Sequence, residues 1–157
     1  MTTEQKARSL ALLTPLVLLG GAFISQFGFG LFPCEMCWWQ RYAHFAALPF
    51  AVLAILMPRQ SKALVALVAL AAVAIAVSAA IGAFHAGVEY HWWQGFTECT
   101  SYAAKGGDPL EAIMNAPLIR CDAAQWTLLG ISLAGFNFLF SGATAVAIFA
   151  LLARKSR

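Results

Sequence analysis

Charged side chains are scarce in this sequence. Asp, Glu, Lys and Arg make up 11% of the 157 residues, whereas hydrophobic residues make up 61%. An ordinary soluble domain is about 25% charged and about 45–50% apolar, so the composition excludes a typical soluble fold. The formal net charge is only +3. The basic residues lie between apolar runs and form no stripe, which excludes a nucleic-acid-binding role.

Nucleotide-binding motifs are also missing, since neither a G-x-G-x-x-G fingerprint nor a P-loop occurs. Cysteine is sparse too. The four cysteines, at positions 34, 37, 99 and 121, are too few for a disulfide-scaffold toxin or growth factor. Their even number nevertheless permits two pairs. No linker is long enough to separate two domains, so we expect a single domain over residues 1–157.

Four apolar segments are long enough to cross a membrane as helices, which takes about 20 residues each. We expect these helices at about residues 10–32, 37–57, 63–88 and 126–152. The first segment is much longer than the ~7–15 apolar residues of a signal peptide, so we expect it to be retained. The predicted fold class is therefore all-α, an integral membrane four-helix bundle.

A long loop, at about residues 89–125, separates the third and fourth helices. Within it, Asp108 reads as an N-cap, Pro109 as the first helical residue and Glu111 as a capping-box acid. The sequence therefore predicts a short amphipathic helix that lies flat on the bilayer until Pro117 ends it.

The distribution of basic residues predicts the orientation, because Lys and Arg are retained on the cytoplasmic side. One side carries Lys6, Arg8, Arg59, Lys62, Arg154, Lys155 and Arg157. The other side carries Arg41, Lys105 and Arg120. Both termini are therefore expected in the cytoplasm and all four cysteines on the outer face. In a bacterium that face is the periplasm, where disulfides form and persist.

The C-x-x-C motif formed by Cys34 and Cys37 lies at a predicted helix N-terminus, where free N–H groups favour a thiolate. Arg41 follows Cys37 by four residues on the same helix face, so it can stabilise that thiolate or hold a polar ligand group. Its position also fits an arginine that reaches the lipid headgroups. His85 is a weaker candidate, because a lone histidine near a helix end is more often hydrogen-bonded packing than a ligand.

Three interpretations of the cysteines compete: two redox-active pairs, two inert disulfides, or one four-cysteine zinc site. A structural zinc site usually presents two tight C-x-x-C turns, whereas Cys99 and Cys121 are 22 residues apart. A C-x-x-C disulfide is strained and easily reduced, which suits thiol–disulfide exchange better than a purely structural role. Redox activity is the favoured interpretation, and no metal is expected.

The run PCEMCWWQR at residues 33–41 resembles the signature of the DsbB family of disulfide bond formation proteins. The likeness extends to the four-helix layout, the cytoplasmic termini, the second cysteine pair in the outer loop, and Cys121 between Arg120 and Asp122. It covers nearly the whole chain. One departure is Gln40, which stands where some members carry an acid.

The resemblance implies an enzyme of the bacterial inner membrane that oxidises a periplasmic DsbA-like dithiol protein and passes the electrons to a membrane quinone, ubiquinone or menaquinone. It implies that Cys99 forms the mixed disulfide with the partner and that Cys121 then attacks Cys34 or Cys37. It further implies that Cys37 faces the quinone. Arg41 would polarise a quinone oxygen, and His85 would assist at the other side of the ring.

Two alternative functions are considered, one a related enzyme and one from a different class. A vitamin-K-epoxide-reductase-like thiol oxidase couples the same kinds of partners, but its quinone-proximal C-x-x-C would be expected late in the chain. A non-catalytic membrane protein would use its disulfides only to hold the outer loop.

Overall fold

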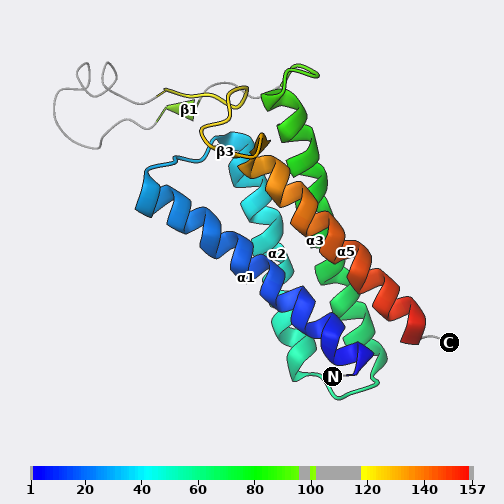
Figure 1. Cartoon of the computed structure of the whole chain (residues 1–157). Coiled ribbons are helices and arrows are strands. Elements are labelled where there is room, and N and C mark those ends of the chain that lie inside the picture. Colours follow the sequence, from blue (N-terminus) through cyan, green and yellow to red (C-terminus); the bar gives the residue numbers. More distant parts are fainter. Residues whose placement is uncertain (1, 96–99, 102–117, 156–157) are drawn as a thin grey trace.

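The computed structural model describes residues 2–95, 100–101 and 118–155. Within them it contains four helices and two short strand pairs. The helices are α1 (Thr3–Phe29), α2 (Glu35–Leu56), α3 (Lys62–Glu89) and α5 (Leu133–Lys155). They pack as one bundle with the N- and C-termini at the same end, and α1 diverges from the others toward its C-terminal end (Figure 1). The prediction of a helical fold is confirmed.

Three of these helices, α1, α3 and α5, are long and apolar enough to cross a membrane. The helix α2 has 22 residues, but Gln40, Arg41 and His44 near its start make that end polar. Its crossing of the bilayer therefore stays a prediction.

The helix α1 begins at Thr3, several residues before the predicted start at about residue 10. Thr2 forms a capping box, because its side chain accepts from the Gln5 amide while the Gln5 side chain accepts from the Thr2 amide. Arg8 and Glu4 add an ion pair at 2.9 Å. Hydropathy alone finds the apolar part of a helix, whereas these polar contacts extend it. At the other end α1 stops at Gly30, whose φ of 69° is left-handed.

The last helix begins at Leu133, so the predicted start at Trp126 is wrong. The strands β3 (Thr127–Leu128) and β4 (Ile131–Ser132) form an antiparallel hairpin there instead. Its two central residues, Leu129 and Gly130, have φ values of 53° and 78°. A two-residue turn with positive φ at both positions matches the twist of a hairpin. Gly130, which falls within the predicted helix at about residues 126–152, thus belongs to a turn.

Tyr90 fastens this hairpin to the end of α3. Its hydroxyl donates to the carbonyl of Gly130 at 2.9 Å and accepts from the amide of Ser132 at 3.0 Å. The Ser132 side chain in turn accepts from the Gly135 amide at 3.1 Å, which caps the start of α5.

Small residues form much of the bundle core. Among the fully buried core residues are Ala47, Ala51, Ala54, Ala71, Ala72 and Ile75. In a bilayer the lipid is as apolar as the helix surface, so small residues stabilise helix pairs by letting the backbones approach closely. The helix α3 packs extensively against both α2 and α5. The alanine-rich helix α3 therefore lies at the centre of the bundle.

A second strand pair lies at the end of the bundle opposite the termini. The strands β1 (Thr100–Ser101) and β2 (Leu118–Ile119) pair antiparallel, with Thr100 opposite Ile119. Ile119 is buried in a cluster with Cys34, Met36 and Val88. The predicted amphipathic helix at 108–117 and Cys99 lie outside the described residues.

Candidate functional site

The two cysteines of the C-x-x-C motif form the first turn of α2. Cys34 is the N-cap, with extended backbone angles, and its sulfur accepts a hydrogen bond from the Cys37 amide at 3.3 Å. The two sulfurs lie 2.9 Å apart. Cys34 is buried, whereas Cys37 is half-buried. This geometry gives one shielded and one more accessible thiol at a helix N-terminus.

Cys121 lies beside this pair, buried in the same cluster as Cys34 and Met36. A hydrogen bond with Cys121 lowers the pKa of the Cys34 thiol, but the hydrogen bond with Cys37 and burial together outweigh it and raise that pKa to about 12. The structure thus brings together three of the four predicted cysteines. The fourth, Cys99, lies outside the described residues.

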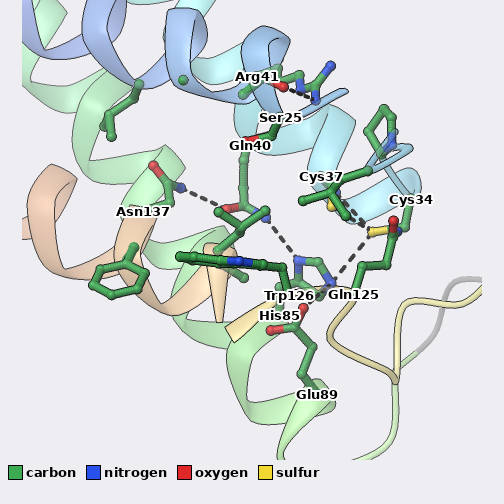
Figure 2. Close-up of a pocket in the computed structure, with 18 of the residues that line it drawn as sticks. Ser25, Cys34, Cys37, Gln40, Arg41, His85, Glu89, Gln125, Trp126 and Asn137 are labelled. Carbon is green, nitrogen blue, oxygen red and sulfur yellow. Dashed lines mark hydrogen bonds and ion pairs between the residues drawn. The ribbon is translucent and has the colours of Figure 1, made fainter. Parts of the chain in front are cut away.

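His85 reaches the same sulfur from α3. Its Nε2 atom lies 3.5 Å from the sulfur of Cys34 and 3.6 Å from a carboxylate oxygen of Glu89 (Figure 2). The ring is 2% exposed. The sequence indicated hydrogen-bonded packing as the more common role of a lone histidine at this position. His85 does form hydrogen bonds, but one of its partners is Cys34 of the C-x-x-C motif.

Glu89 was not singled out by the sequence analysis. Its side chain is largely buried, and its Oε2 atom has no hydrogen-bond partner among the described residues. The available signal was its position four residues after His85, at the end of an otherwise apolar helix, because residues four apart share a helix face.

A buried polar network continues from His85 across the bundle. Gln40 lies 3.0 Å from His85, and Asn137 donates to the side-chain oxygen of Gln40 at 2.8 Å. Asn137 also contacts Ser78, Ser141 and His44. Asn137 thereby joins α2, α3 and α5 through side-chain hydrogen bonds.

Arg41 points toward α1 and is 6% exposed. Its guanidinium donates to the Gln26 side chain at 2.5 Å and to the Ala22 carbonyl at 3.2 Å. It also lies between two aromatic rings, 5.1 Å from the centre of Phe23 and 5.0 Å from that of Trp38. A side chain held this way inside the bundle does not match the alternative of an arginine that extends to headgroups.

A cavity of about 560 Å³ lies between α1 and the rest of the bundle. Apolar side chains form most of its wall, among them Val17, Leu18, Leu133, Phe136 and Phe140. Polar groups converge on it from Cys34, Cys37, Gln40, Arg41, His85, Glu89 and Asn137. An apolar cleft of this size with a few converging polar groups is typical of a small-molecule site.

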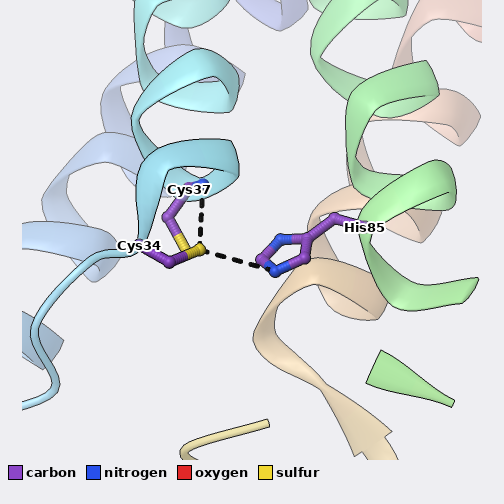
Figure 3. A group of neighbouring side chains, drawn as sticks. All are labelled: Cys34, Cys37 and His85. Atoms are coloured by element: carbon purple, nitrogen blue, oxygen red, sulfur yellow. Dashed lines mark hydrogen bonds between the residues drawn. The ribbon is translucent and has the colours of Figure 1, made fainter. Parts of the chain in front are cut away.

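Cys34, Cys37 and His85 could also hold a metal ion, because their ligand atoms all lie within 4.8 Å of one another (Figure 3). Two sulfurs and an imidazole nitrogen suit zinc or copper(I). This set differs from the four-cysteine site weighed above, since His85 takes part in it. The expectation that the protein binds no metal stays a prediction.

Comparisons with known proteins agree on one family. The family model described as "Disulfide bond formation protein DsbB" matches residues 4–151. A Disulfide bond formation protein B of Acidovorax sp. (strain JS42) is 31% identical over 161 residues, covering 90% of this chain and 88% of the relative. Another protein of that name, from Verminephrobacter eiseniae (strain EF01-2), is 30% identical and covers 99% of this chain and 89% of the relative. No solved structure gives a significant match.

Proposed function

The chain belongs to the DsbB family of disulfide bond formation proteins, and we propose that it is the quinone-dependent oxidase of a DsbA-like dithiol protein. The observation that carries this proposal is the meeting of Cys34, Cys37 and Cys121 beside one apolar cavity that Arg41 also lines. Thiol exchange and a lipid-soluble electron acceptor both need that arrangement.

The first step is an exchange between the partner and the loop pair. A thiolate of the reduced partner attacks Cys99 in a Cys99–Cys121 disulfide, which releases Cys121 as a thiolate. The second partner thiol then attacks the partner's own sulfur in this mixed disulfide and releases Cys99. The partner has lost two electrons and leaves as a disulfide, and the loop pair has become a dithiol.

The second step moves the electrons to the C-x-x-C pair. Cys121 contacts Cys34 in the structure, so its thiolate attacks Cys34 in a Cys34–Cys37 disulfide, and Cys37 leaves at the N-terminus of α2, where main-chain N–H groups stabilise a thiolate. Cys99 then attacks Cys121, which restores the loop disulfide and releases Cys34. The two electrons now reside on the Cys34 and Cys37 dithiol.

The cavity fits a quinone head group. Its volume of about 560 Å³ lies within the range of small-molecule sites, and its largely apolar wall suits a ring that dissolves in lipid. Quinone, when bound there, would accept the two electrons and two protons of the dithiol. Cys37 would supply the adjacent sulfur, and Arg41 would place a fixed positive charge beside a ring oxygen. His85 would lie on the Cys34 side.

The membrane arrangement belongs to the same proposal. We propose that α2 crosses the bacterial inner membrane together with α1, α3 and α5. Both termini then lie in the cytoplasm and the cysteines in the periplasm. The excess of Lys and Arg at the end of the bundle that holds the termini supports this orientation. After reduction, we expect a membrane-impermeant maleimide to label the cysteines in intact spheroplasts. If the cysteines were labelled only after lysis, this orientation would be contradicted.

The decisive experiment measures quinone reduction by the purified protein in detergent with a reduced DsbA-like partner. The parent is compared with Cys37→Ser, Arg41→Ala and the control Arg59→Ala, which changes an exposed arginine between α2 and α3. We expect no turnover for Cys37→Ser, slow turnover for Arg41→Ala and the parental rate for Arg59→Ala. Equal rates in all four proteins would refute the site.

The same sample separates the alternatives. Inert structural disulfides would stay closed when reduced partner is added, so alkylation before and after its addition would give the same pattern. A metal assay would detect zinc held by the cysteines.

A further inference from the structure

The orientation of the Gln40 amide is fixed by its neighbours. Its Nε2 atom lies 3.2 Å from the main-chain carbonyl oxygen of Met36. A carbonyl oxygen can only accept a hydrogen bond, so the Gln40 atom that faces it must be the NH2 group. The other end of the amide, Oε1, receives a hydrogen bond from Asn137 at 2.8 Å.

Asn137 is fixed in the same way. Its Nδ2 atom lies 3.1 Å from the carbonyl oxygen of Ser78, which again identifies it as the NH2 group. Its Oδ1 atom accepts from the hydroxyl of Ser141 at 2.9 Å. The two amides therefore confirm each other's orientation, and a flip of either one would place two donors or two acceptors face to face.

This arrangement determines which nitrogen of His85 carries the proton. One N–H of the Gln40 amide faces Met36, and the other faces the Nδ1 atom of His85 at 3.0 Å. An amide nitrogen only donates, so Nδ1 must accept and the neutral ring carries its proton on Nε2. That Nε2–H group is the one beside the sulfur of Cys34 (Figure 2).

We propose that Gln40 is a positioning residue that holds His85 in its Nε2–H tautomer, so that the ring donates a hydrogen bond to Cys34 whenever that sulfur is a thiolate. This inference rests on the proposed function, in which Cys34 is the sulfur released when Cys99 attacks Cys121. A thiol with a pKa near 12 is a poor leaving group. A buried donor aimed at its sulfur stabilises the departing charge.

A carboxylate at position 40 would have the opposite effect. It would accept from the ring, draw the proton to Nδ1 and leave Nε2 without a hydrogen to donate. Gln40→Glu therefore changes the tautomer while nearly preserving shape. Gln40→Met removes the donor and the acceptor without adding a charge. Gln40→Glu has a matched control in Gln60→Glu, which makes the same chemical change at an exposed site between α2 and α3.

The direct test is nitrogen NMR of the reduced full-length protein labelled with 15N-histidine, with the His85 signals identified by their loss in His85→Gln. We expect the parent and Gln60→Glu to show an unprotonated Nδ1 and a protonated Nε2. Gln40→Glu is expected to move the proton to Nδ1, and Gln40→Met to give a mixture. A protonated Nδ1 in the parent, or the same tautomer in all variants, would overturn the inference.

A kinetic readout accompanies the spectra. The rate at which the C-x-x-C pair becomes reduced, measured by rapid mixing with reduced partner in the absence of quinone, is expected to fall roughly 10- to 100-fold in Gln40→Glu, as for a lost hydrogen bond to a charged group. Gln40→Met, in which part of the rings keep the Nε2–H group, is expected to lose less. Full parental rates in Gln40→Glu would overturn the role of the donor. A protein that shows the expected tautomer but reduces no quinone would instead refute the proposed function while leaving the tautomer assignment intact.

Discussion

The main-chain amide of Cys37 donates a hydrogen bond to the sulfur of Cys34, with 3.3 Å between nitrogen and sulfur. The two sulfurs nevertheless differ in environment, because Cys34 is 2% exposed whereas Cys37 is half-buried beside the cavity. The C-x-x-C turn therefore holds two thiols of unequal reactivity.

Alkylation of the reduced protein should reveal that inequality. The pKa of Cys34 is raised to about 12, so its thiolate fraction stays very small below pH 9 and rises only as the pH approaches 12. We expect iodoacetamide to modify Cys37 first, and the slow modification of Cys34 to accelerate with each unit of pH. Fragmentation mass spectrometry locates the modified residue. Equal rates at the two cysteines in the folded protein would contradict the assignment, and equal rates in denatured protein serve as the control.

Replacement of Arg41 by lysine tests whether charge alone suffices at the cavity. Lysine keeps the positive charge but cannot stack as a plane between Phe23 and Trp38 or donate in several fixed directions. We expect kcat/KM for quinone to fall by at least about tenfold, with no change in the rate of exchange between Cys121 and Cys34. Steady-state kinetics with varied quinone and rapid mixing without it separate these steps. Arg59→Lys is the matched control, and a parental kcat/KM in Arg41→Lys would show that the guanidinium is not needed.

Arg120 and Asp122, the neighbours of Cys121 in the chain, form an ion pair whose formation depends on pH. Arg120 donates to both carboxylate oxygens of Asp122, at 2.8 and 2.6 Å. A hydrogen bond from Arg120 lowers the pKa of Asp122 from 3.8 to about 2. Because the folded-state pKa is lowered, the pair is intact above about pH 4 and is lost as the pH falls through 2. Carboxyl NMR should give a midpoint near 2 that moves back toward 3.8 in Arg120→Gln. The remote variant Lys62→Gln should leave it unchanged, and an unshifted midpoint in Arg120→Gln would contradict the pairing.

The helices could be predicted from the sequence because each apolar run must satisfy its backbone groups internally. Their ends were harder to predict, since local polar contacts set them. The capping box of Thr2 and Gln5 extends α1 beyond its apolar run, and the turn at Leu129 and Gly130 delays α5. Gly130 was the available signal, but a glycine inside an apolar segment fits helix packing equally well.

The cysteine pair and Arg41 could be identified because they lie close together in sequence, within about two turns at the start of one helix. The network of Gln40, His85 and Asn137 could not, because its members come from three helices and their contacts depend on how each helix is rotated. Gln40 and Asn137 are 97 residues apart along the chain yet form a hydrogen bond. A single sequence contains no information on such pairs until the helices are packed.

The helices α3 and α5 approach each other closely at Gly82, so adding one methyl group there is expected to destabilise the protein. A Cβ atom at Gly82 would lie 3.0 Å from the Ala134 carbonyl oxygen, 3.0 Å from the Asn137 side chain and 3.1 Å from the Phe138 amide. Two of these atoms belong to the backbone of α5, so Gly82→Ala must push the helices apart and weaken the hydrogen bonds of Asn137. We expect a loss of roughly 1–3 kcal/mol in unfolding free energy, measured by circular dichroism during denaturation in detergent. Gly20→Ala in α1 is the control. Apart from the backbone of α1 itself, no atom of the described residues lies within 4 Å of a Cβ at Gly20, and alanine favours a helix by up to about 1 kcal/mol. If both variants were as stable as the parent, the close approach of α3 and α5 at Gly82 would be refuted.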